Sequence, residues 1–553
     1  MPHPLFEKHQ ELLKEGIDAL QYRGYWCPYA DTPAAYGKNA AADGHKALEA
    51  YLDAQFYLDQ PGVFARGGEE VSPYGLPLNI SYPQSSPDAL IAAAKLAMPA
   101  WVKAGADTRA GVCAEILSRL NVASMEIAHA VMHTTGQSLA MAFLSAGPHA
   151  QARGLEAVIS AYREMKQVPE SAIWEKSQIH HPQIRMEKQF SIVPRGVALV
   201  IACSTFPTWN AYPGIFASLV TGNPVIVKAH PRVILPLAIS VAVARQALKD
   251  AGFDANLISL LIDDRETLVA REIALKPDIR IIDYTGGPAF GEWLEQHARQ
   301  AVVYAEKSGV NCIVVDSTTD YPGMLHNLAI TLSLNSGQMC TTPQTLFVPI
   351  TGVRTADGVV STEEFGTQLA AAIGKFLEDS ERAIEVLGAI RSPLIDERID
   401  ACSDLGTVLR DSVTLIHPQY PKARIRTPLL VKVSIYDHEA WMVEHFGPIS
   451  FLVETESTSV SLAVVERTMR EKGAITFSVY STDENILQLV DDVSLRNGVS
   501  LSLNLTDNIF VNQTAGFSDF QATGANPAAN ACLTSSAYVA GRFFVVQKRQ
   551  HIP

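Results

Sequence analysis

The feature that most constrains the fold is a long alternation of short apolar runs and amphipathic segments between residues 196 and 503. The runs at 196–203, 225–228 and 279–284 have the composition of buried strands, and the segment 235–251 has apolar residues at helical spacing. Strands that alternate with helices predict parallel sheets covered on both faces. We therefore predict an α/β fold with two doubly wound parallel sheets, whose ligands bind beyond the C-terminal ends of the strands.

The remaining segments have other patterns. Residues 85–170 are predicted to be helical, and residues 174–194 alternate with period two, which indicates a β-ribbon. Residues 1–80 begin with a helix candidate and continue with aromatic and proline-rich stretches, so we expect an ordered extension packed on the main body, without chemistry of its own. A chain of 553 residues is too long for one core, which predicts several domains.

Composition excludes several classes of protein. The net charge of −14 argues against a general binder of nucleic acid or of anionic membranes. Seven scattered cysteines without a CxxC pair fit a reducing compartment and predict no metal site. With no run of 18 apolar residues and no apolar leader, we expect a cytoplasmic protein that does not enter a membrane.

One cysteine stands in a setting that could present a reactive thiol. Cys340 closes the polar stretch Asn335-Ser336-Gly337-Gln338-Met339-Cys340, directly after a helix candidate at 321–334. A thiol is a weak nucleophile until it is deprotonated or given a base. Glu306, which ends the apolar run 301–305, is a candidate base. Taken alone, such a cysteine is more often a small core residue, and such a glutamate a solvated loop charge.

A glycine-rich turn follows the strand candidate 279–284. Gly286, Gly287 and Gly291 lie where this strand passes into a helix candidate. Glycines permit close backbone approach, and a helix N-terminus favours an anion such as a pyrophosphate. Lys228, at another strand end, could hydrogen-bond ribose hydroxyls, although a surface lysine is the simpler interpretation.

Five motifs in a fixed order resemble those of the aldehyde dehydrogenase superfamily. The cysteine stretch and Glu306 are two of them, and the others are 222–228, 284–291 and Glu444-His445-Phe446-Gly447-Pro448. Within the superfamily, the chain is most similar to the PaaN-type branch of phenylacetic acid degradation. That similarity covers nearly the whole chain and depends on 133–137, 205–213, 517–520 and 524–530.

The resemblance implies a domain plan. Residues 81–173 and 195–305 would form a cofactor-binding domain, and 306–503 a catalytic domain. Residues 174–194 and 504–553 would supply an oligomerisation ribbon and the C-terminal segment, with 543–547 as the matching strand. The ribbon would leave an apolar sheet edge exposed in a monomer, so we expect at least a homodimer.

The resemblance also assigns roles to residues. Cys340 would be the nucleophile and Glu306 the base, and the Cys340 backbone N–H would be the first oxyanion donor. The position of the second donor, an Asn in the family, is Thr205 when counted without gaps from Lys228, and Asn210 is the alternative. The implied cofactor-binding residues are Phe206, Lys228, His230, Arg232, Thr285, Gly286, Gly287, Gly291, Glu444 and Phe446.

The cofactor is expected to be NADP, with NAD as the alternative. NAD-preferring relatives often carry a Glu three residues after the strand-end Lys, where it accepts the 2′-hydroxyl and repels a 2′-phosphate. Here that position is Pro231, and Lys228, His230 and Arg232 supply donors or positive charge nearby.

The resemblance implies oxidation of an aldehyde to an acid through a cysteine thioester, the substrate being a semialdehyde, free or linked to coenzyme A, from aromatic-acid breakdown. One alternative is an acylating enzyme in which coenzyme A takes the acyl group. Another is a non-enzymatic oligomeric binding protein on the same scaffold. The presence of both Glu306 and Cys340 favours the hydrolytic enzyme.

Overall fold

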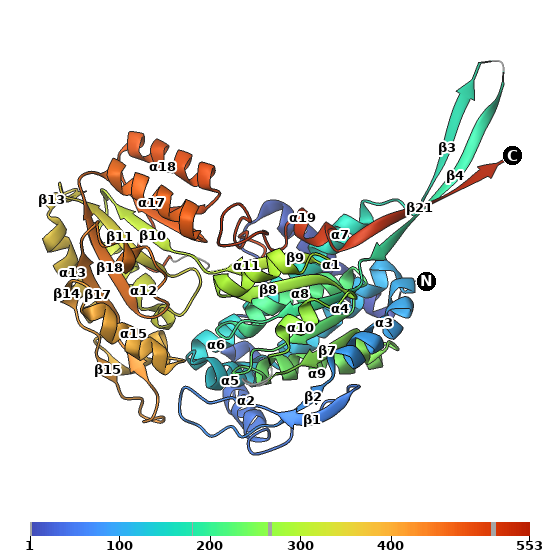
Figure 1. Cartoon of the computed structure of the whole chain (residues 1–553), viewed down its shortest axis with the longest axis horizontal. Coiled ribbons are helices and arrows are strands. Elements are labelled where there is room, and N and C mark those ends of the chain that lie inside the picture. Colours follow the sequence, from blue (N-terminus) through green and yellow to red (C-terminus); the bar gives the residue numbers. More distant parts are fainter. Residues whose placement is uncertain (1–2, 180, 264–267, 510–515) are drawn as a thin grey trace.

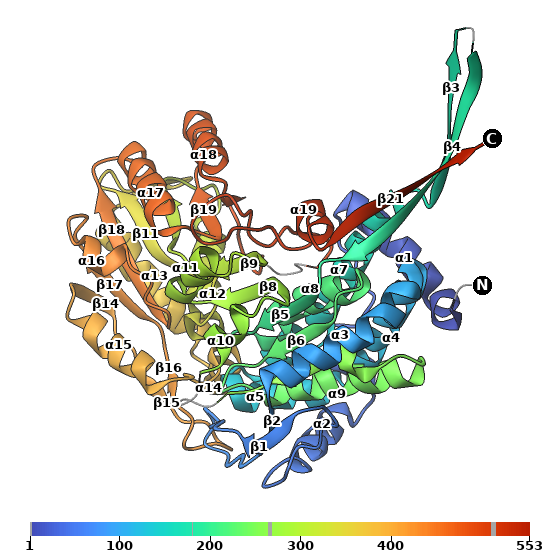
Figure 2. The same ribbon diagram turned by 45° about the vertical axis from the view of Figure 1, so that its right-hand side comes forward.

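The computed structural model describes residues 3–179, 181–263, 268–509 and 516–553. Two bodies, each built on a parallel sheet, lie side by side, and a long ribbon projects from one of them (Figures 1 and 2).

The first sheet is wholly parallel and has the strand order β7-β6-β5-β8-β9. The chain order reverses between β5 and β8, which is where ligands of such sheets bind. Its strands are β5 (Val197–Ile201), β6 (Val225–Lys228), β7 (Ile258–Leu261), β8 (Ile279–Gly286) and β9 (Val302–Lys307).

Helices cover both faces of this sheet, as the apolar runs predict. Ala198 and Val200 of β5 enter the core cluster shared with α8 and α9, while Val197 and Leu199 enter the cluster shared with α3 and α11. The helices of this body are α3 (Pro87–Lys103), α4 (Gly105–Val122), α5 (Ser124–Thr135), α6 (Leu139–Ala146), α7 (Pro148–Lys166), α8 (Pro207–Val220), α9 (Leu235–Asp250), η2 (Ala255–Leu257), α10 (Ala270–Ala274) and α11 (Pro288–His297).

The second sheet has seven strands in the order β14-β17-β18-β11-β10-β19-β20, and only the edge strand β14 is antiparallel to its neighbour. Its strands are β10 (Asn311–Val315), β11 (Pro343–Pro349), β14 (Thr407–Arg410), β17 (Leu429–Val433), β18 (Ile449–Thr455), β19 (Thr476–Tyr480) and β20 (Ser500–Leu503). Two small hairpins, β12 (Val353–Thr355) with β13 (Gly358–Val360) and β15 (Thr414–Leu415) with β16 (Ile425–Arg426), flank it. Its helices are α12 (Tyr321–Ser333), η3 (Leu334–Gly337), α13 (Thr362–Phe376), α14 (Ser380–Leu387), α15 (Pro393–Ser403), α16 (His438–Trp441), α17 (Thr458–Lys472) and α18 (Glu484–Asn497).

The ribbon is antiparallel, with β4 (His181–Pro194) between β3 (Ser171–Gln178) and β21 (Phe543–Ile552). It extends away from both bodies, and the C-terminus lies along it (Figure 1). The preceding helix α19 (Ser536–Ala540) rests on α7.

The N-terminal segment lies against the first body. It contains α1 (Pro4–Tyr22), η1 (Pro33–Tyr36), α2 (Ala40–Glu49) and the antiparallel pair β1 (Val63–Gly67) and β2 (Tyr82–Ser85). Helix α1 packs on α4 and α7, and α2 packs on α5. Within the described ranges, no single helix is long and apolar enough to span a bilayer, and only the bent pair α3–α4 passes by length and composition.

Candidate active site

Cys340 follows a tight loop that leaves the end of α12. Asn335, Ser336 and Gly337 are three consecutive left-handed residues, with φ of 50°, 49° and 62°. Two of them are not glycine, so the backbone carries strain here. A Cβ on Gly337 would collide with the carbonyl oxygen of Gly447, so only glycine fits at this position.

Hydrogen bonds from three directions hold this loop. The Ser336 hydroxyl donates to the Leu387 carbonyl over 3.0 Å, and the Gln338 amide donates to the Ala389 carbonyl over 3.1 Å. The Asn311 amide donates to the Cys340 carbonyl over 2.8 Å, while its own oxygen accepts from the backbone N–H groups of Ile475 and Thr476. The position of the thiol is therefore set by the second sheet and by α14.

Glu306 lies next to the thiol. The distance from Cys340 Sγ to Glu306 Oε1 is 3.6 Å, although Glu306 belongs to β9 of the first sheet and Cys340 to the turn that precedes β11 of the second. Glu306 is 3% exposed, and burial raises the pKa of its carboxyl, while Arg153, Gln521 and Cys340 act to lower it. Burial and the Glu306 charge raise the pKa of the Cys340 thiol. Glu306 thus has an apolar, low-dielectric setting that suits proton transfer with the thiol or with a water.

The segment after residue 515, which the sequence groups with the ribbon, holds Glu306 in place. Gln521 Nε2 donates to Glu306 Oε1 over 3.3 Å. The Ala305 N–H donates to Asn530 Oδ1 over 2.7 Å, and the Asn530 N–H returns a bond to the Ala305 carbonyl over 3.0 Å. The Lys307 N–H donates to the Ala528 carbonyl over 2.6 Å. Sequence reasoning missed Gln521 because a lone glutamine in a loop carries no motif signal.

Arg153 of α7 is a second residue that the sequence did not reveal. Its side chain is buried and lies 4.8 Å over the Trp209 ring. Its charge opposes the rise in the Glu306 pKa. The sequence could not indicate it, because α7 carries several other polar and charged residues and Arg153 belongs to no motif.

The thiol opens into a cavity of about 970 Å³. Asn210, Phe206 and Trp209 of the α8 segment line it together with Cys340, whereas Thr205 is not among its lining residues. The Asn210 amide donates to Cys203 Sγ over 3.4 Å, and the Thr205 hydroxyl faces the same sulfur at 3.8 Å. The placement therefore favours Asn210 over Thr205 as the group that can reach a molecule beside Cys340.

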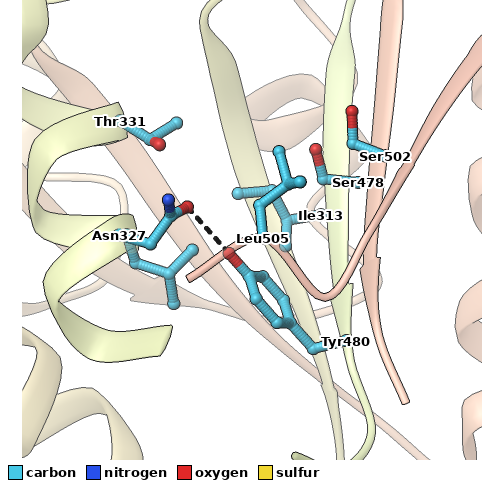
Figure 3. A pocket seen from close by; sticks show the side chains of 8 residues that line it. Ile313, Asn327, Thr331, Ser478, Tyr480, Ser502 and Leu505 are labelled. Atoms are coloured by element: carbon cyan, nitrogen blue, oxygen red, sulfur yellow. Dashed lines mark hydrogen bonds between the residues drawn. The ribbon is translucent and has the colours of Figure 1, made fainter. Parts of the chain in front are cut away.

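A second void in the other body is far smaller. It lies between α12, β10 and β19 and has a volume of about 10 Å³ (Figure 3). The Tyr480 hydroxyl donates to Asn327 Oδ1 over 2.9 Å beside it. Such a void holds at most one water, so it is a packing defect rather than a ligand site.

Lys228 lies at the C-terminal end of β6 and is buried. Its Nζ is 2.7 Å from Asp263 Oδ1, a carboxylate just beyond the neighbouring strand β7. Burial lowers the pKa of Lys228, and Asp263 opposes that effect. The expectation of NADP came from Pro231, which stands where NAD-preferring relatives often carry a Glu. Pairing of β6 with β7 brings a different carboxylate, Asp263, to Lys228 from outside that motif. His230 Nδ1 accepts from the Arg232 N–H over 3.1 Å, which shapes the turn after β6.

The glycine turn leads from β8 into α11 next to Glu306. Pairing of β8 with β9 sets Thr285 beside Glu306, and Gly286 beside Lys307. The Tyr284 hydroxyl donates to the Gly287 carbonyl over 2.8 Å, and Gly287 caps α11 without a side-chain bond. A Cβ on Gly287 would meet open space, whereas one on Gly291 would crowd Lys307 at 2.6 Å. The N-terminus of α11 therefore lies open to an anion.

Glu444 and Phe446 lie on the loop between α16 and β18. Both are half-buried, and burial raises the pKa of Glu444. The Phe446 carbonyl accepts from Arg398 Nη1 over 2.6 Å. His445 between them is held on both ring nitrogens, by Cys402 Sγ at 3.3 Å and by the Ala440 carbonyl at 2.7 Å. This loop belongs to the second body, and the charge of Glu444 acts on the Cys340 thiol.

The sequence model of the aldehyde dehydrogenase family matches residues 82–491. The chain belongs to this family. It is 50% identical to an NAD-dependent aldehyde dehydrogenase from Burkholderia multivorans, whose crystal structure it matches over 100% of both chains with a TM-score of 0.98. The aldehyde dehydrogenase fold predicted from the motifs is thereby confirmed.

More distant relatives agree on the family. An N-succinylglutamate 5-semialdehyde dehydrogenase from Paraburkholderia xenovorans is 25% identical over 383 residues, which is 68% of this chain and 73% of the relative. A 1-pyrroline-5-carboxylate dehydrogenase from Thermus with bound NAD has a TM-score of 0.73 at 16% identity, covering 95% of this chain and 99% of its own, which shows a shared fold. This protein is accordingly an oxidoreductase of the aldehyde dehydrogenase family.

Proposed function

We propose that this aldehyde dehydrogenase oxidises an aldehyde to a carboxylic acid through a covalent intermediate on Cys340. The observation that carries the proposal is the 3.6 Å separation of Cys340 Sγ and Glu306 Oε1 beside a cavity large enough for an organic substrate. A nucleophile with a base in reach is the arrangement that acyl-transfer chemistry needs.

The chain's own groups divide the steps between them. Glu306 takes the thiol proton as sulfur adds to the aldehyde carbon, and the carbonyl oxygen becomes an oxyanion. The Cys340 N–H and the Asn210 amide are proposed to bind that oxyanion, with Asn210 now preferred to Thr205 because it lines the cavity. Loss of hydride leaves a thioester on Cys340. Glu306 releases the thiol proton to solvent and, ionised again, removes a proton from water, whose oxygen attacks the thioester carbon. The C–S bond then breaks, the acid is released, and Glu306 returns its proton to the Cys340 sulfur.

A nicotinamide dinucleotide supplies the hydride acceptor in this chemistry. The residues present fit such a group. The uncapped N-terminus of α11 after Gly286 and Gly287 suits its pyrophosphate, and Lys228 with Asp263 suits a ribose. The other proposed cofactor residues lie on neighbouring elements: Thr285 at the end of β8, His230 and Arg232 after β6, Phe206 just before α8, and Gly291 in the first turn of α11. Glu444 and Phe446 lie on the loop between α16 and β18 of the second body.

NAD, rather than the NADP expected from the sequence, is the proposed cofactor. Asp263 supplies the carboxylate that would accept a 2′-hydroxyl and repel a 2′-phosphate. The NAD dependence of the Burkholderia multivorans relative supports this choice. The expected wild-type preference is for NAD, and Asp263→Asn should raise relative kcat/KM with NADP, with Asp18→Asn, an exposed carboxylate of α1, as control. An NADP preference in the wild type would instead restore Arg232 and His230 as phosphate ligands.

The substrate and the acyl acceptor are further proposals. The resemblance to the PaaN-type branch supports a semialdehyde of aromatic-acid breakdown, with or without coenzyme A. Glu306, buried and beside the thiol, supports water as acceptor, while an acylating enzyme would pass the acyl group to coenzyme A.

The test is a stopped-flow assay of reduced cofactor with free and coenzyme-A-linked aldehydes, followed by acid quench and product mass. Free acid as product supports the proposal, and an acyl-coenzyme A product would establish the acylating alternative. No reduced cofactor with any aldehyde would leave only a binding protein on this scaffold.

A further inference from the structure

The N-terminal segment contributes directly to the cavity beside Cys340. Tyr25, Asp31 and Thr32 line it together with residues of α6, α8 and α14. Nothing in residues 1–80 predicted a position at the reaction centre, because the segment carries no motif and lies far from Cys340 in the chain.

This part of the segment is fixed at both ends. Arg23 at the end of α1 has left-handed backbone, donates to Glu156 Oε1 over 2.7 Å and stacks on the Phe520 ring at 4.0 Å. Trp26 meets Phe517 edge to face with ring centres 4.6 Å apart.

The far end of the loop is closed by Tyr36. Its hydroxyl donates to the Ala30 carbonyl over 2.8 Å and accepts from the Asn121 amide over 2.7 Å. Its ring packs edge to face on Phe143. Residues 25–32 are thus anchored at both ends and form one wall of the cavity.

The cavity lining combines apolar and charged side chains. Its apolar members include Met141, Leu144, Trp209, Met339 and Val386. The described lining residues also include two carboxylates and one guanidinium, Asp31, Glu385 and Arg382, and the guanidinium lies 4.7 Å over the Phe376 ring. Burial lowers the pKa of His149, the lining histidine, which keeps it neutral at pH 7. Among these described lining residues, carboxylates therefore outnumber the cationic groups.

Resting on the proposed function, we propose that residues 25–32 form the specificity wall of the aldehyde cavity, which selects aldehydes with a long apolar body and an uncharged far end. A volume near 970 Å³ is large for a two-carbon aldehyde and suits a bulky one. A carboxylate or a coenzyme A phosphate would be repelled by Asp31 and Glu385 of the lining. The specificity wall therefore rests only on the proposed oxidation at Cys340, and it favours a neutral aldehyde over the semialdehyde that the resemblance implies.

The test uses free aldehydes of increasing length and the matched pair hexanal and 6-oxohexanoate. In the wild type, kcat/KM should rise roughly fourfold per added methylene until the cavity is filled, and hexanal should exceed 6-oxohexanoate by about tenfold. Thr32→Trp should lower kcat/KM for decanal far more than for acetaldehyde, because only the long aldehyde extends to the filled part of the cavity. Asp31→Asn should shrink the hexanal preference several-fold, while Asp18→Asn, an exposed carboxylate of α1 outside the cavity lining, should not.

The outcomes separate the two proposals. If no aldehyde, acetaldehyde included, yields reduced cofactor, the proposed function fails. If acetaldehyde is turned over but Thr32→Trp and Asp31→Asn leave the length and charge profiles unchanged, the wall is refuted and the function stands. A coenzyme-A-linked semialdehyde preferred over hexanal would also overturn the wall's selectivity.

Discussion

Burial governs the chemistry of Cys340 and Glu306. It raises the pKa of both groups, and the charge of Glu306 raises that of the thiol further. A thiol in this setting stays protonated at neutral pH until a base accepts its proton. Without substrate the Cys340 thiol therefore stays protonated and unreactive, and we expect its proton to pass to Glu306 when an aldehyde binds.

Cys340→Ala should remove aldehyde oxidation and the covalent acyl-enzyme while leaving cofactor binding intact. Of the thiols near the described site, Cys340 is the one that lines the cavity and lies 3.6 Å from Glu306 Oε1, so it is the group expected to form the thioester. Mass spectrometry of quenched enzyme checks the loss of the acyl-enzyme, and a cofactor titration checks that cofactor binding is retained. The buried Cys312→Ala serves as control, and a Cys340→Ala variant that kept a tenth of wild-type turnover would falsify the assignment.

Glu306→Gln keeps the shape of the side chain and removes the base. We expect about one equivalent of reduced cofactor per site and then a stall, with steady-state turnover lower by roughly 10²–10⁴-fold. Because burial raises the Glu306 pKa above 4.5, wild-type kcat should fall as the pH drops through that raised value, where the carboxylate becomes protonated. The variant should lack this acid limb, and a limb that survives would place the base elsewhere.

Asn210→Ala and Thr205→Val form a matched pair for the second oxyanion donor. Loss of one such donor costs roughly 10²–10³-fold in kcat. We expect that loss in Asn210→Ala and a much smaller one in Thr205→Val, because only Asn210 lines the cavity. The reverse order of effects would return the role to Thr205.

Among the site residues, those with a motif were predictable and those without one were not. Cys340 and Glu306 were proposed from short stretches, and the structure brings them together. Gln521 and Asp263 reach the site only through strand pairing and a returning C-terminal segment. No local pattern encodes such long-range placement.

At the scale of elements, a buried ion pair fixes the C-terminal segment to the first sheet. The Arg542 guanidinium binds the Asp283 carboxylate of β8 at 2.5 and 2.8 Å, donates to Ser218 and lies 4.2 Å over the Tyr538 ring. Both charged groups are buried. Each buried charge is therefore compensated by the other.

Arg542→Met should destabilise the protein by about 3–5 kcal/mol, because it leaves Asp283 buried without its partner. Urea unfolding followed by fluorescence measures the change, and Arg549→Met, exposed on the same strand, should be near neutral. Equal midpoints for the two variants would show that the pair adds nothing.

Elements with strong local patterns were predicted best. The strand predicted at 225–228 matches β6 at both ends, and the one predicted at 279–284 begins where β8 begins. Helix α8 was missed because Pro207 and Pro213 interrupt its pattern, although Pro207 stands at its first turn, where proline is tolerated. The short helices α14 and α15 and the hairpin β15–β16 lack the length that makes periodicity readable.

At the scale of the whole molecule, the ribbon stands apart from both bodies (Figures 1 and 2). Phe544, Val545 and Val546 are consecutive and are 46%, 46% and 54% exposed, so both faces of β21 present apolar side chains to solvent. Soluble proteins rarely leave such a surface uncovered. We propose that a second copy of the chain covers it.

Multi-angle light scattering at micromolar concentration should therefore give a dimer or a larger oligomer. Val546→Glu should shift the mass toward the monomer by placing a charge on the apolar surface. Val122→Glu, an exposed apolar position at the end of α4, is the matched control and should not change the mass. A monomeric wild type would contradict the proposal.

The hydrogen bonds from residues 521–530 to β9 also determine when the site is completed during synthesis. The ribosome completes Glu306 and Cys340 long before it adds Gln521, Ala528 and Asn530, which hold the base. A nascent chain would carry the nucleophile for many seconds without its fixed proton acceptor. The thiol would gain its full reactivity only when residues 521–530 bind to β9. A product truncated before these residues would therefore have Cys340 without a fixed proton acceptor.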